Sequence, residues 1–533
     1  MARDRERLRA EMGFGVKSLP RLPIVLLCGL LLWAVTARSG LLKETLLRSR
    51  TGPANAPRTV LRIWDWWSPG TDERYAAYFA ALKSEFEQLH PDVEIVFQYV
   101  PFPQYEQKMA TGLVGANPPD VFQSSVYWAE GFYDRGMLLP LNGFMERDRA
   151  ERERRRASGM PVDPGESVDR EAFLEAAWRH NTKQDGTVFG IPQILDSNCL
   201  VWNLEILQKA AERDSEIRGM FVRKPDGSPD YGHLRFDAIQ DWAQFRRVVK
   251  KLTRYDAKGD LLLDSSGNFV QSGFALHAHG SGAEPFMPWI AANGSNFQDA
   301  AGTKALFAGT EGVEAAQFLL DLYWKDHVSP PFRRQMSDDE VFNQGKVGCI
   351  VTGTWAGKYI IRNTEGKLKF DLTPLPPGPH GSGPATLTWG NMLVISRASA
   401  HKDLAWEYVK FVTSKTGALR ILKLLDWNSG RKDFYDAPDW QETCRKKPYQ
   451  TNVPAIAACG KKLRHTQINA SNYACQATFE TLLLHYPEIE RGQGSVPSLQ
   501  AGLQQAAEAV DRVYDRYNAQ TADWKAARRE PAP

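Results

Sequence analysis

Cysteine is scarce in this chain, with six residues among 533. Their spacings do not resemble the ligand set of a structural zinc site, so a zinc module is excluded. Cys199 and Cys349 lie in apolar runs and are expected to be buried thiols. Cys444, Cys459 and Cys475 come late in the chain, and one disulfide among them is expected in an oxidising compartment. Because five cysteines follow residue 37, at least one thiol remains free.

The chain also has almost no net charge. It contains 66 Lys and Arg residues against 63 Asp and Glu residues. Residues 1–37 hold six basic and three acidic side chains, which account for the whole excess. The remainder is neutral, so no basic surface is expected and nucleic acid is excluded as a partner.

Long hydrophobic runs are missing after the N-terminus. The uncharged run at 22–37 follows a basic stretch that ends at Arg21. About 15 apolar residues suit a signal peptide better than a membrane span, which needs about 20. We therefore expect residues 1–37 to be a signal peptide cleaved before Arg38, or a retained membrane anchor, and residues 38–57 to be a linker. Either way, the body of the protein is expected to work in the periplasm or elsewhere outside the cytoplasm.

Signatures of catalysis are missing as well. The chain contains no Gly-x-Ser-x-Gly elbow and no His-Glu-x-x-His helix. The segment 353–359 superficially resembles a phosphate-binding loop but lacks its glycine spacing and its Ser or Thr. His277, His279 and Glu284 could hold a metal, although ordinary polar residues in a glycine-rich loop are the favoured interpretation. No cofactor and no metal are expected, and an enzyme is not the favoured class.

Alternating strands and helices are present instead. Strands are expected at 60–64, 93–100 and 120–123, and helices at 72–90, 105–114 and 128–135. Further strands are expected at 187–203, 346–352 and 391–396, and further helices at 237–252, 311–325, 404–413 and 499–517. This order predicts an α/β fold with mixed, mostly parallel sheets covered by helices on both faces. A chain of 533 residues is too long for one ordinary core, so two lobes are expected.

Three polar stretches interrupt this alternation, at 146–170, 213–232 and 433–470. The first contains a dense mixed-charge run at 146–156, including Arg154, Arg155 and Arg156. Its acidic neighbours favour a solvated loop insertion over a nucleic-acid patch. The role of the three insertions is left open.

Several ordered segments carry a family resemblance. They include Trp66-Trp67-Ser68, Phe86 to Val93, Pro118 to Phe122, Gly136 to Leu141, Gly190-Ile191-Pro192 with Leu200 to Asn203, Phe342 to Val347, Gly353 to Ala356, Leu375 to Pro379 and Ala405 to Phe411. Together, and in this order, they resemble the extracellular solute-binding proteins of carbohydrate ABC transporters, the group that contains maltose-binding protein. The resemblance covers about residues 58–430 well and the remainder loosely.

The resemblance implies a type II periplasmic-binding-protein fold, in which two lobes joined by crossover strands close on a ligand between them. The crossover strands would be 194–203 and 387–396. The N-terminal lobe would comprise 58–196 with 397–430, and the C-terminal lobe 203–386 with 431–520, followed by a disordered tail at 521–533.

A sugar ligand needs flat aromatic rings for its C–H faces and paired polar groups for its hydroxyls. Trp66 and Trp67 follow the first strand, and one of them is expected to touch the ligand, whereas Trp64 is expected in the core. Asp65 could bind hydroxyls or cap the turn. Small polar groups that follow the strand 120–123, namely Ser124, Ser125 and Tyr127, could donate to hydroxyls.

The crossover strands and the second lobe supply the other candidates. Asp196 falls where sugar-binding relatives have an acidic residue, and Trp355 aligns with the stacking tryptophan of the family. Trp389 and Asn391 flank the second crossover strand. Trp289 is a further candidate, although its neighbours also suit a core. The lowest-ranked candidates are Trp427, Asn428 and Arg431.

The resemblance implies a function in binding. The protein is expected to be the extracytoplasmic substrate-binding component of an ABC importer, a monomer that delivers a sugar or oligosaccharide to the permease. The alternatives are a membrane-tethered ligand-sensing subunit and an exported polysaccharide-active enzyme. The identity and length of the sugar are left open.

Overall fold

The structure is a computed structural model that describes residues 58–115, 117–126, 128–276, 286–299, 303–331, 338–460 and 468–527. Apart from Arg58 and Thr59, these residues belong to one compact unit, Val60–Pro533. The predicted leader (1–37) and linker (38–57) lie outside the described residues.

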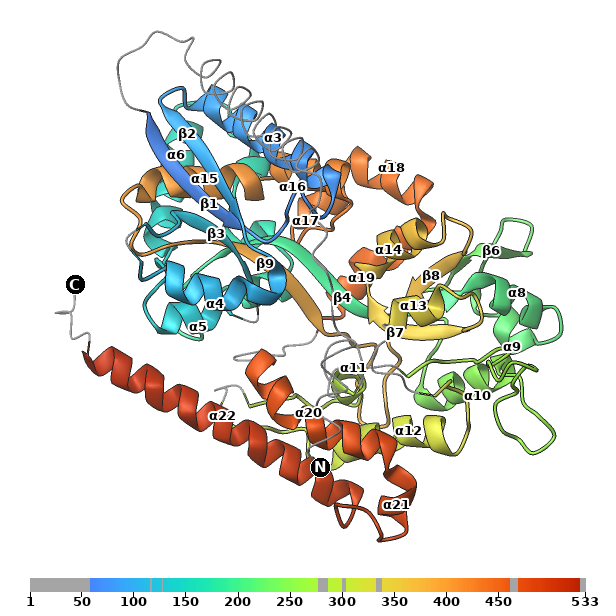
Figure 1. The fold of residues 1–533 in the computed structure, drawn as a ribbon. Helices are drawn as coiled ribbons and strands as arrows, with labels where there is room; N and C mark the ends of the chain where they lie inside the picture. The colour runs from blue at the N-terminus through green and yellow to red at the C-terminus, as the bar shows by residue number, and fades with distance from the viewer. Residues whose placement is uncertain are drawn as a thin grey trace, which may run out of the picture. The chain divides into compact units, whose positions relative to one another are not determined.

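Within the described residues, seven strands form one mixed sheet in the order β2-β1-β3-β9-β4-β7, with β8 also beside β4 (Figure 1). They are β1 (Thr59–Asp65), β2 (Val93–Tyr99), β3 (Val121–Ser125), β4 (Ile191–Asn203), β7 (Cys349–Gly353), β8 (Phe370–Thr373) and β9 (Thr388–Ile395). β1 and β3 are parallel, whereas β9 runs antiparallel to both β3 and β4, and β4 runs antiparallel to β7 and β8. The predicted mixed α/β fold is confirmed. Antiparallel pairs are more frequent than the order of the first strands suggests, because β9 returns late in the chain between β3 and β4.

Strand β4 belongs to both halves of this sheet. Its first part, from Ile191 to Ser197, pairs with β9, and its second part, from Asn198 to Asn203, pairs with β7 and in part with β8. All of its 13 residues are buried. Its pairing with β9 shifts register between Pro192 and Ile194, next to a proline that has no N–H to donate. The two segments predicted as crossover strands are therefore neighbouring strands.

Helices pack beside the β1–β3 half of the sheet. They are α3 (Glu73–Leu89), α4 (Phe102–Gly112), α5 (Ala129–Asp134), α6 (Asn142–Ala157), α7 (Glu175–Arg179), α15 (Lys402–Thr413) and α16 (Lys415–Leu425). The side chain of Asp72 accepts from the backbone N–H of Arg74 and caps α3, which ends before Pro91. The helix predicted at 72–90 is confirmed, and one face of α3 is buried in an aromatic core with α15 and α16.

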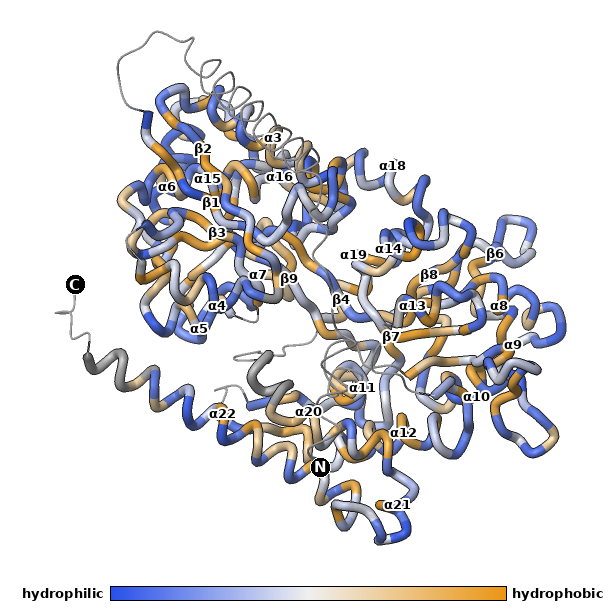
Figure 2. The backbone as a smooth tube through the Cα atoms, in the orientation of Figure 1, coloured by the Kyte–Doolittle hydropathy of each residue, from blue (hydrophilic) through white to orange (hydrophobic). Residues whose placement is uncertain are grey.

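The later part of the chain carries a second set of helices. They are α8 (Leu204–Ala211), α9 (Ser215–Arg218), α10 (Trp242–Leu252), α11 (Met287–Ala292), α12 (Thr310–Trp324), α13 (Asp338–Phe342), α14 (Ala356–Asn363), α20 (Ile468–Leu484), α21 (Tyr486–Glu490) and α22 (Leu499–Ala527). Helices α20 and α22 pack together (Figure 1). In Figure 2, hydrophobic and hydrophilic residues alternate along α22, as expected for a helix with one buried face.

The three polar stretches are more ordered than the sequence suggested. The charged run predicted as a loop within 146–170 is largely helical, since α6 extends to Ala157, although most of its side chains remain exposed. The stretch 213–232 contains α9 and the hairpin strands β5 (Phe221–Arg223) and β6 (Pro229–Leu234). The stretch 433–470 contains α17 (Lys432–Tyr435), α18 (Pro438–Lys446), η3 (Pro448–Asn452) and α19 (Val453–Ala458).

Buried aromatic side chains explain the order at 433–470. Phe434, Trp440 and Tyr449 join a core cluster together with residues of β4, β7 and β8. The polar composition of the stretch concealed these anchors. The short 3-10 helices η1 (Pro164–Glu166) and η2 (Arg170–Ala172) complete the region after α6.

Two further expectations need correction. Helix α22 extends to Ala527, so residues 521–527 of the expected disordered tail are helical; the helix-forming residues there continue the helix past Tyr517. Cys444 and Cys459 carry free thiols. Every pair among Cys444, Cys459 and Cys475 includes one of these two, so the expected disulfide is not formed. Free Cys349 agrees with the expected unpaired thiol.

Arg431 lies between α16 and α17 and connects this segment to the rest of the core. Its side chain is fully buried and donates from Nε and Nη2 to the two carboxylate oxygens of Asp433, each at 2.8 Å. Its Nη1 also donates to the backbone carbonyls of Ser167 at 2.7 Å and Thr413 at 3.2 Å. Its guanidinium carbon lies 5.3 Å from the centroid of the Phe173 ring. This network makes Arg431 a structural residue.

We predict that Arg431→Met lowers the free energy of unfolding by roughly 3 kcal/mol, because two carbonyls and a carboxylate lose their buried donor. Urea unfolding measured by circular dichroism checks this value. Arg445→Met is the matched control, since Arg445 is 68% exposed on α18 and its loss should cost less than about 0.5 kcal/mol. Equal costs for the two variants would contradict the structural role of Arg431.

Candidate functional site

Five predicted site residues lie on three adjacent strands. Ser124 and Ser125 belong to β3, Trp389 and Asn391 to β9, and Asp196 to β4. Asn391 is opposite Ser125 on one side and Ile194 on the other, and Trp389 is opposite Asp196. The register of β9 therefore brings together segments that are far apart in the sequence.

Asp196 is almost fully buried and forms a hydrogen bond across to the β7 side. Its Oδ1 accepts from Thr354 Oγ1 at 3.0 Å, and that hydroxyl oxygen accepts from the backbone N–H of Ser197 at 3.2 Å. Burial raises the pKa of Asp196 to about 6, while the positive charge of Lys358 and the hydrogen bond from Thr354 act in the opposite direction. One donor does not satisfy a carboxylate, which can accept about four hydrogen bonds.

Trp355 comes directly after Thr354, where β7 ends and α14 begins. Its side chain is half-buried against the core cluster of α14 and β7, and its ring covers Gly353 so closely that no Cβ fits there. Gly353 is opposite Asn198 in the β4–β7 ladder. Trp355 is therefore the direct sequence neighbour of Thr354, the residue whose hydroxyl donates to Asp196.

Trp389 is also half-buried. Its indole Nε1 donates to Asn198 Oδ1 at 2.6 Å, and its ring contacts two different core clusters. The hydrogen bond fixes the plane of the indole. Asn198 lies two residues after Asp196, the residue opposite Trp389, so this hydrogen bond runs diagonally between β9 and β4.

The opening tryptophans separate into different surroundings. Trp64 is buried within β1 beside α4, as predicted. Trp66 lies past the strand and makes edge-to-face contacts with Phe102, Tyr105 and Trp128. Trp67 is 3% exposed.

Trp67 stacks against two other rings. The ring of Tyr75 lies 5.6 Å away at an interplanar angle of 8°, and that of Trp427 lies 5.9 Å away at 11°. The adjacent Asp65 is buried, and its Oδ1 accepts from the backbone N–H of Trp67 at 2.7 Å. Burial raises the pKa of Asp65 well above its usual range. Of the two roles expected for Asp65, capping the turn is the one that this hydrogen bond shows.

Several other predicted site residues are buried. Ser124 and Ser125 lie inside β3, which extends two residues beyond its predicted end, and both are buried. Trp289 is fully buried on α11, with its ring against Trp242 and Phe245. These surroundings are those of core residues. Tyr127 and the metal candidates His277, His279 and Glu284 lie outside the described residues.

Lys358 is a residue whose importance the sequence did not reveal. It lies one turn into α14, is 8% exposed, and its Nζ lies 2.7 Å from the centroid of the Trp427 ring. Burial lowers its pKa well below the usual range of lysine, whereas Asp196 raises it. The sequence places Trp427 among the lowest-ranked site candidates. In the structure, the backbone carbonyl of the next residue, Asn428, accepts from the backbone N–H of Leu195, so this segment lies against β4. A lysine on a helix normally indicates an exposed face, which is why it was missed.

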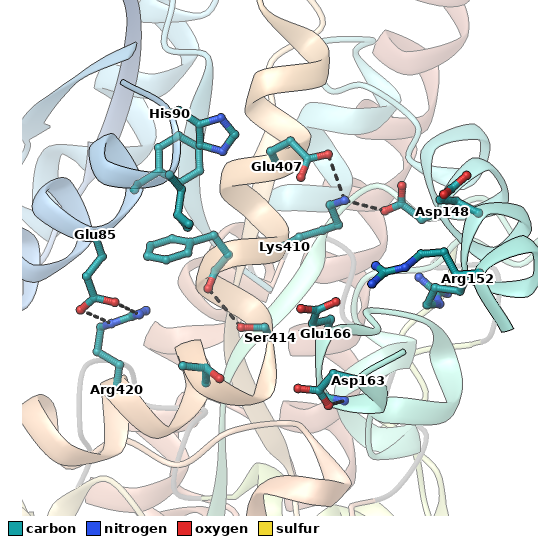
Figure 3. Close-up of a pocket in the computed structure, with 17 residues that line it drawn as sticks. Glu85, His90, Asp148, Arg152, Asp163, Glu166, Glu407, Lys410, Ser414 and Arg420 are labelled. Atoms are coloured by element: carbon teal, nitrogen blue, oxygen red, sulfur yellow. Dashed lines mark hydrogen bonds and ion pairs between the residues drawn. The ribbon is translucent and has the colours of Figure 1, made fainter. Parts of the chain in front are cut away.

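A separate pocket of about 480 Å³ lies away from these residues (Figure 3). Its walls come from α3, α6, η1, α15 and α16, and none of the predicted site residues lines it. Lys410 bonds Asp148 and Glu407, each at 3.0 Å, and Arg420 pairs with Glu85. The two phenylalanines that line the pocket are mostly covered, so the pocket offers no open ring for a sugar.

Metal chemistry finds no support in the described part of the chain, where no group of three or more His, Cys, Asp or Glu side chains could hold an ion. The geometry around Asp196 instead combines acceptors, a buried amine and half-buried indoles. Such a set can hold a polyhydroxylated molecule by hydrogen bonding and ring stacking.

The fold is that of two-lobed α/β binding proteins. The cyclic alpha-maltosyl-1,6-maltose binding protein from Arthrobacter globiformis superimposes with a TM-score of 0.63 at 18% identity, covering 86% of this chain and 100% of that one. By sequence, a binding protein of Brucella abortus is 22% identical over 384 residues, which is 71% of this chain and 77% of the relative. The arabinooligosaccharide-binding protein of Bacillus subtilis is 19% identical, covering 73% of this chain and 78% of the relative.

Residues 69–419 match the family model of the bacterial extracellular solute-binding proteins. This chain belongs to that family. The match spans β4 and β9 and includes every predicted site residue from Ser124 to Asn391, so the resemblance noted in the sequence is confirmed.

We predict that Asp196→Asn stabilises the fold at neutral pH. The pKa of Asp196 is about 6 in the folded protein against 3.8 ordinarily, so its stabilising contribution is complete below pH 3.8 and is lost as the pH rises through about 6. Asparagine keeps the hydrogen bond from Thr354 without the buried charge. Urea unfolding should therefore show a larger gain for the variant at pH 7.5 than at pH 4. A gain that is equal at both pH values would show that the carboxylate ionises without cost.

Proposed function

We propose that this protein binds a sugar or oligosaccharide between its two lobes and delivers it to the permease of an ABC importer. The single observation that carries the proposal is the combination of Asp196, Thr354 and Trp355 at the strand shared by both halves of the sheet. Asp196 and Thr354 supply polar groups for hydroxyls, and Trp355 supplies a half-exposed ring for a C–H face. Relatives and structural neighbours named for binding arabinooligosaccharides and a cyclic maltosyl-maltose support this ligand class.

In this proposal the lobes are 58–196 with 397–430 and 203–386 with 431–520, and β4 and β9 form the hinge. Ligand binding favours the closed arrangement because the sugar contacts both lobes only there. The permease recognises the closed form. Trp66, Trp67, Trp389 and Asn391 surround the bound sugar, and no chemical step is required.

The family name places its members outside the cytoplasm. We propose that residues 1–37 direct export, as a cleaved signal peptide or a retained anchor, and that the protein works as a monomer. Among the described residues, the structure has no helix with both the length and the apolar character needed to cross a membrane.

A thermal-shift screen against a saccharide panel tests the proposal. A bound sugar should raise the melting temperature by mass action, by an amount that grows with sugar concentration. Trp355→Ala should weaken binding at least about tenfold, because the stacking surface is lost. Isothermal titration of both proteins gives the ratio of dissociation constants.

Trp324→Ala is the matched control. Trp324 is a half-buried indole on α12 that donates to the carbonyl of Leu483 at 2.8 Å, away from Asp196. It should lower the melting temperature without changing sugar affinity. A panel in which no saccharide shifts the native protein would argue against sugar binding. Unchanged affinity in Trp355→Ala would remove that residue from the site.

A further inference from the structure

Lys358 has a buried amine that the rest of the described chain does not satisfy. Its Nζ is shielded from solvent and makes no hydrogen bond with any described residue. It lies over the Trp427 ring, which also stacks on Trp67. A buried ammonium without an acceptor costs several kcal/mol in general, so a fold retains one only where something else compensates.

The charged groups around the amine do not supply that compensation. Asp72 is engaged by Arg74, at 2.6 Å, and Asp426 is engaged by Lys447. Asp196 acts on Lys358 through space without a hydrogen bond to it.

A second cation lies on the same helix. Arg362, one turn further along α14, is 4.0 Å from Asp72 and mostly exposed. Asp72 therefore lies near two cations, Arg74 and Arg362, and Asp426 is paired with Lys447, so neither carboxylate is reserved for Lys358.

An anionic oxygen is the acceptor that satisfies such an amine best, because a charge-assisted hydrogen bond is about twice as strong as a neutral one. The proposed sugar-binding function specifies what carries that oxygen. The rings of Trp427 and Trp67 stack on each other beside the amine, and the ring of Tyr359 lies 5.3 Å from it, so these rings enclose the amine. A carboxylate substituent on a sugar supplies the anionic oxygen.

We propose that Lys358 binds the carboxylate of an acidic sugar held beside Trp427, so that the preferred ligands are saccharides containing uronic acids. The inference rests on the proposed sugar-binding function and specifies its ligand class. Asp196, on the β4 side, accepts from hydroxyls of the same ligand. Lys358 is thus the residue that determines specificity for charge.

Isothermal titration with matched disaccharide pairs tests this. The pairs are galacturonate and galactose, glucuronate and glucose, and mannuronate and mannose disaccharides, which differ only at C6. At least one acidic member should bind about tenfold to a hundredfold more tightly than its neutral counterpart. In Lys358→Met, which keeps the length of the side chain, this ratio should fall to about one. Lys358→Gln provides a second variant that retains a hydrogen-bond donor without charge.

Two controls accompany the titration. Arg362→Met removes the exposed cation on the same helix and should change the ratio less than about threefold, because an exposed charge is screened. Urea unfolding of Lys358→Met should show equal or greater stability than the native protein, since an unpartnered buried amine is lost. This result would exclude misfolding as the reason for lost binding.

The outcomes separate the two proposals. Neutral disaccharides that bind as tightly as their acidic partners would overturn the inference and leave the sugar-binding function intact. A preference for acidic sugars that persists in Lys358→Met would also overturn it. If no disaccharide binds, acidic or neutral, this inference fails; if no member of the saccharide panel binds either, both proposals fail.

Discussion

The structure depends on β4 pairing with β9 in one half of the sheet and with β7 and β8 in the other. β4 is buried along its whole length, and each of its two parts is held by its own partner strands. Asp196 lies close to the point where the partners change, after which Asn198 begins the second set of pairs. A polar group at such a position is held by backbone hydrogen bonds from both halves. The same strand therefore supports the core and positions the candidate site.

The candidate site also weakens the fold that supports it. Asp196 is a buried carboxyl whose side chain accepts from Thr354, and Lys358 is a buried amine with no acceptor among the described residues. The fold would be more stable with an uncharged residue of similar shape at either position. Arg431 offers the contrast, since it is buried to the same degree yet donates to a carboxylate and two carbonyls. Buried charged groups with full hydrogen bonding thus differ from those of the candidate site, which lack it.

Periodicity predicted the regular elements well because each depends on local spacing. The apolar face of α3, its cap at Asp72 and its end before Pro91 are all readable from neighbouring residues. The two halves of the sheet, by contrast, combine distant segments, and only the resemblance to a family suggested β4 and β9 as crossovers. Asp196 and Trp355 were identifiable because the family marks those positions, and Trp389 because it flanks the second crossover strand. Their roles as ligand contacts remain predictions.

Other features could not be read from spacing. Lys358 is ordinary in sequence, and its burial arises from Trp427, which follows α16 and lies far away along the chain. Ser124 and Ser125 were expected past a strand end, but pairing with β9 extends β3 over both residues. The helices at 433–470 depend on aromatic residues that fill space against β8, which polar composition does not reveal.

Strand β9 also bears on how the chain folds. Val121 of β3 pairs with Ile395 of β9, so the edge of the first three strands stays open until residues near position 395 are available. A chain emerging from its N-terminus therefore forms β1, β2 and β3 long before their closing partner exists. Contacts of such large sequence separation slow folding and prolong the exposure of a strand edge. The nascent protein should thus rely on holding factors during this interval, and C-terminal truncation before β9 should yield insoluble rather than half-folded product.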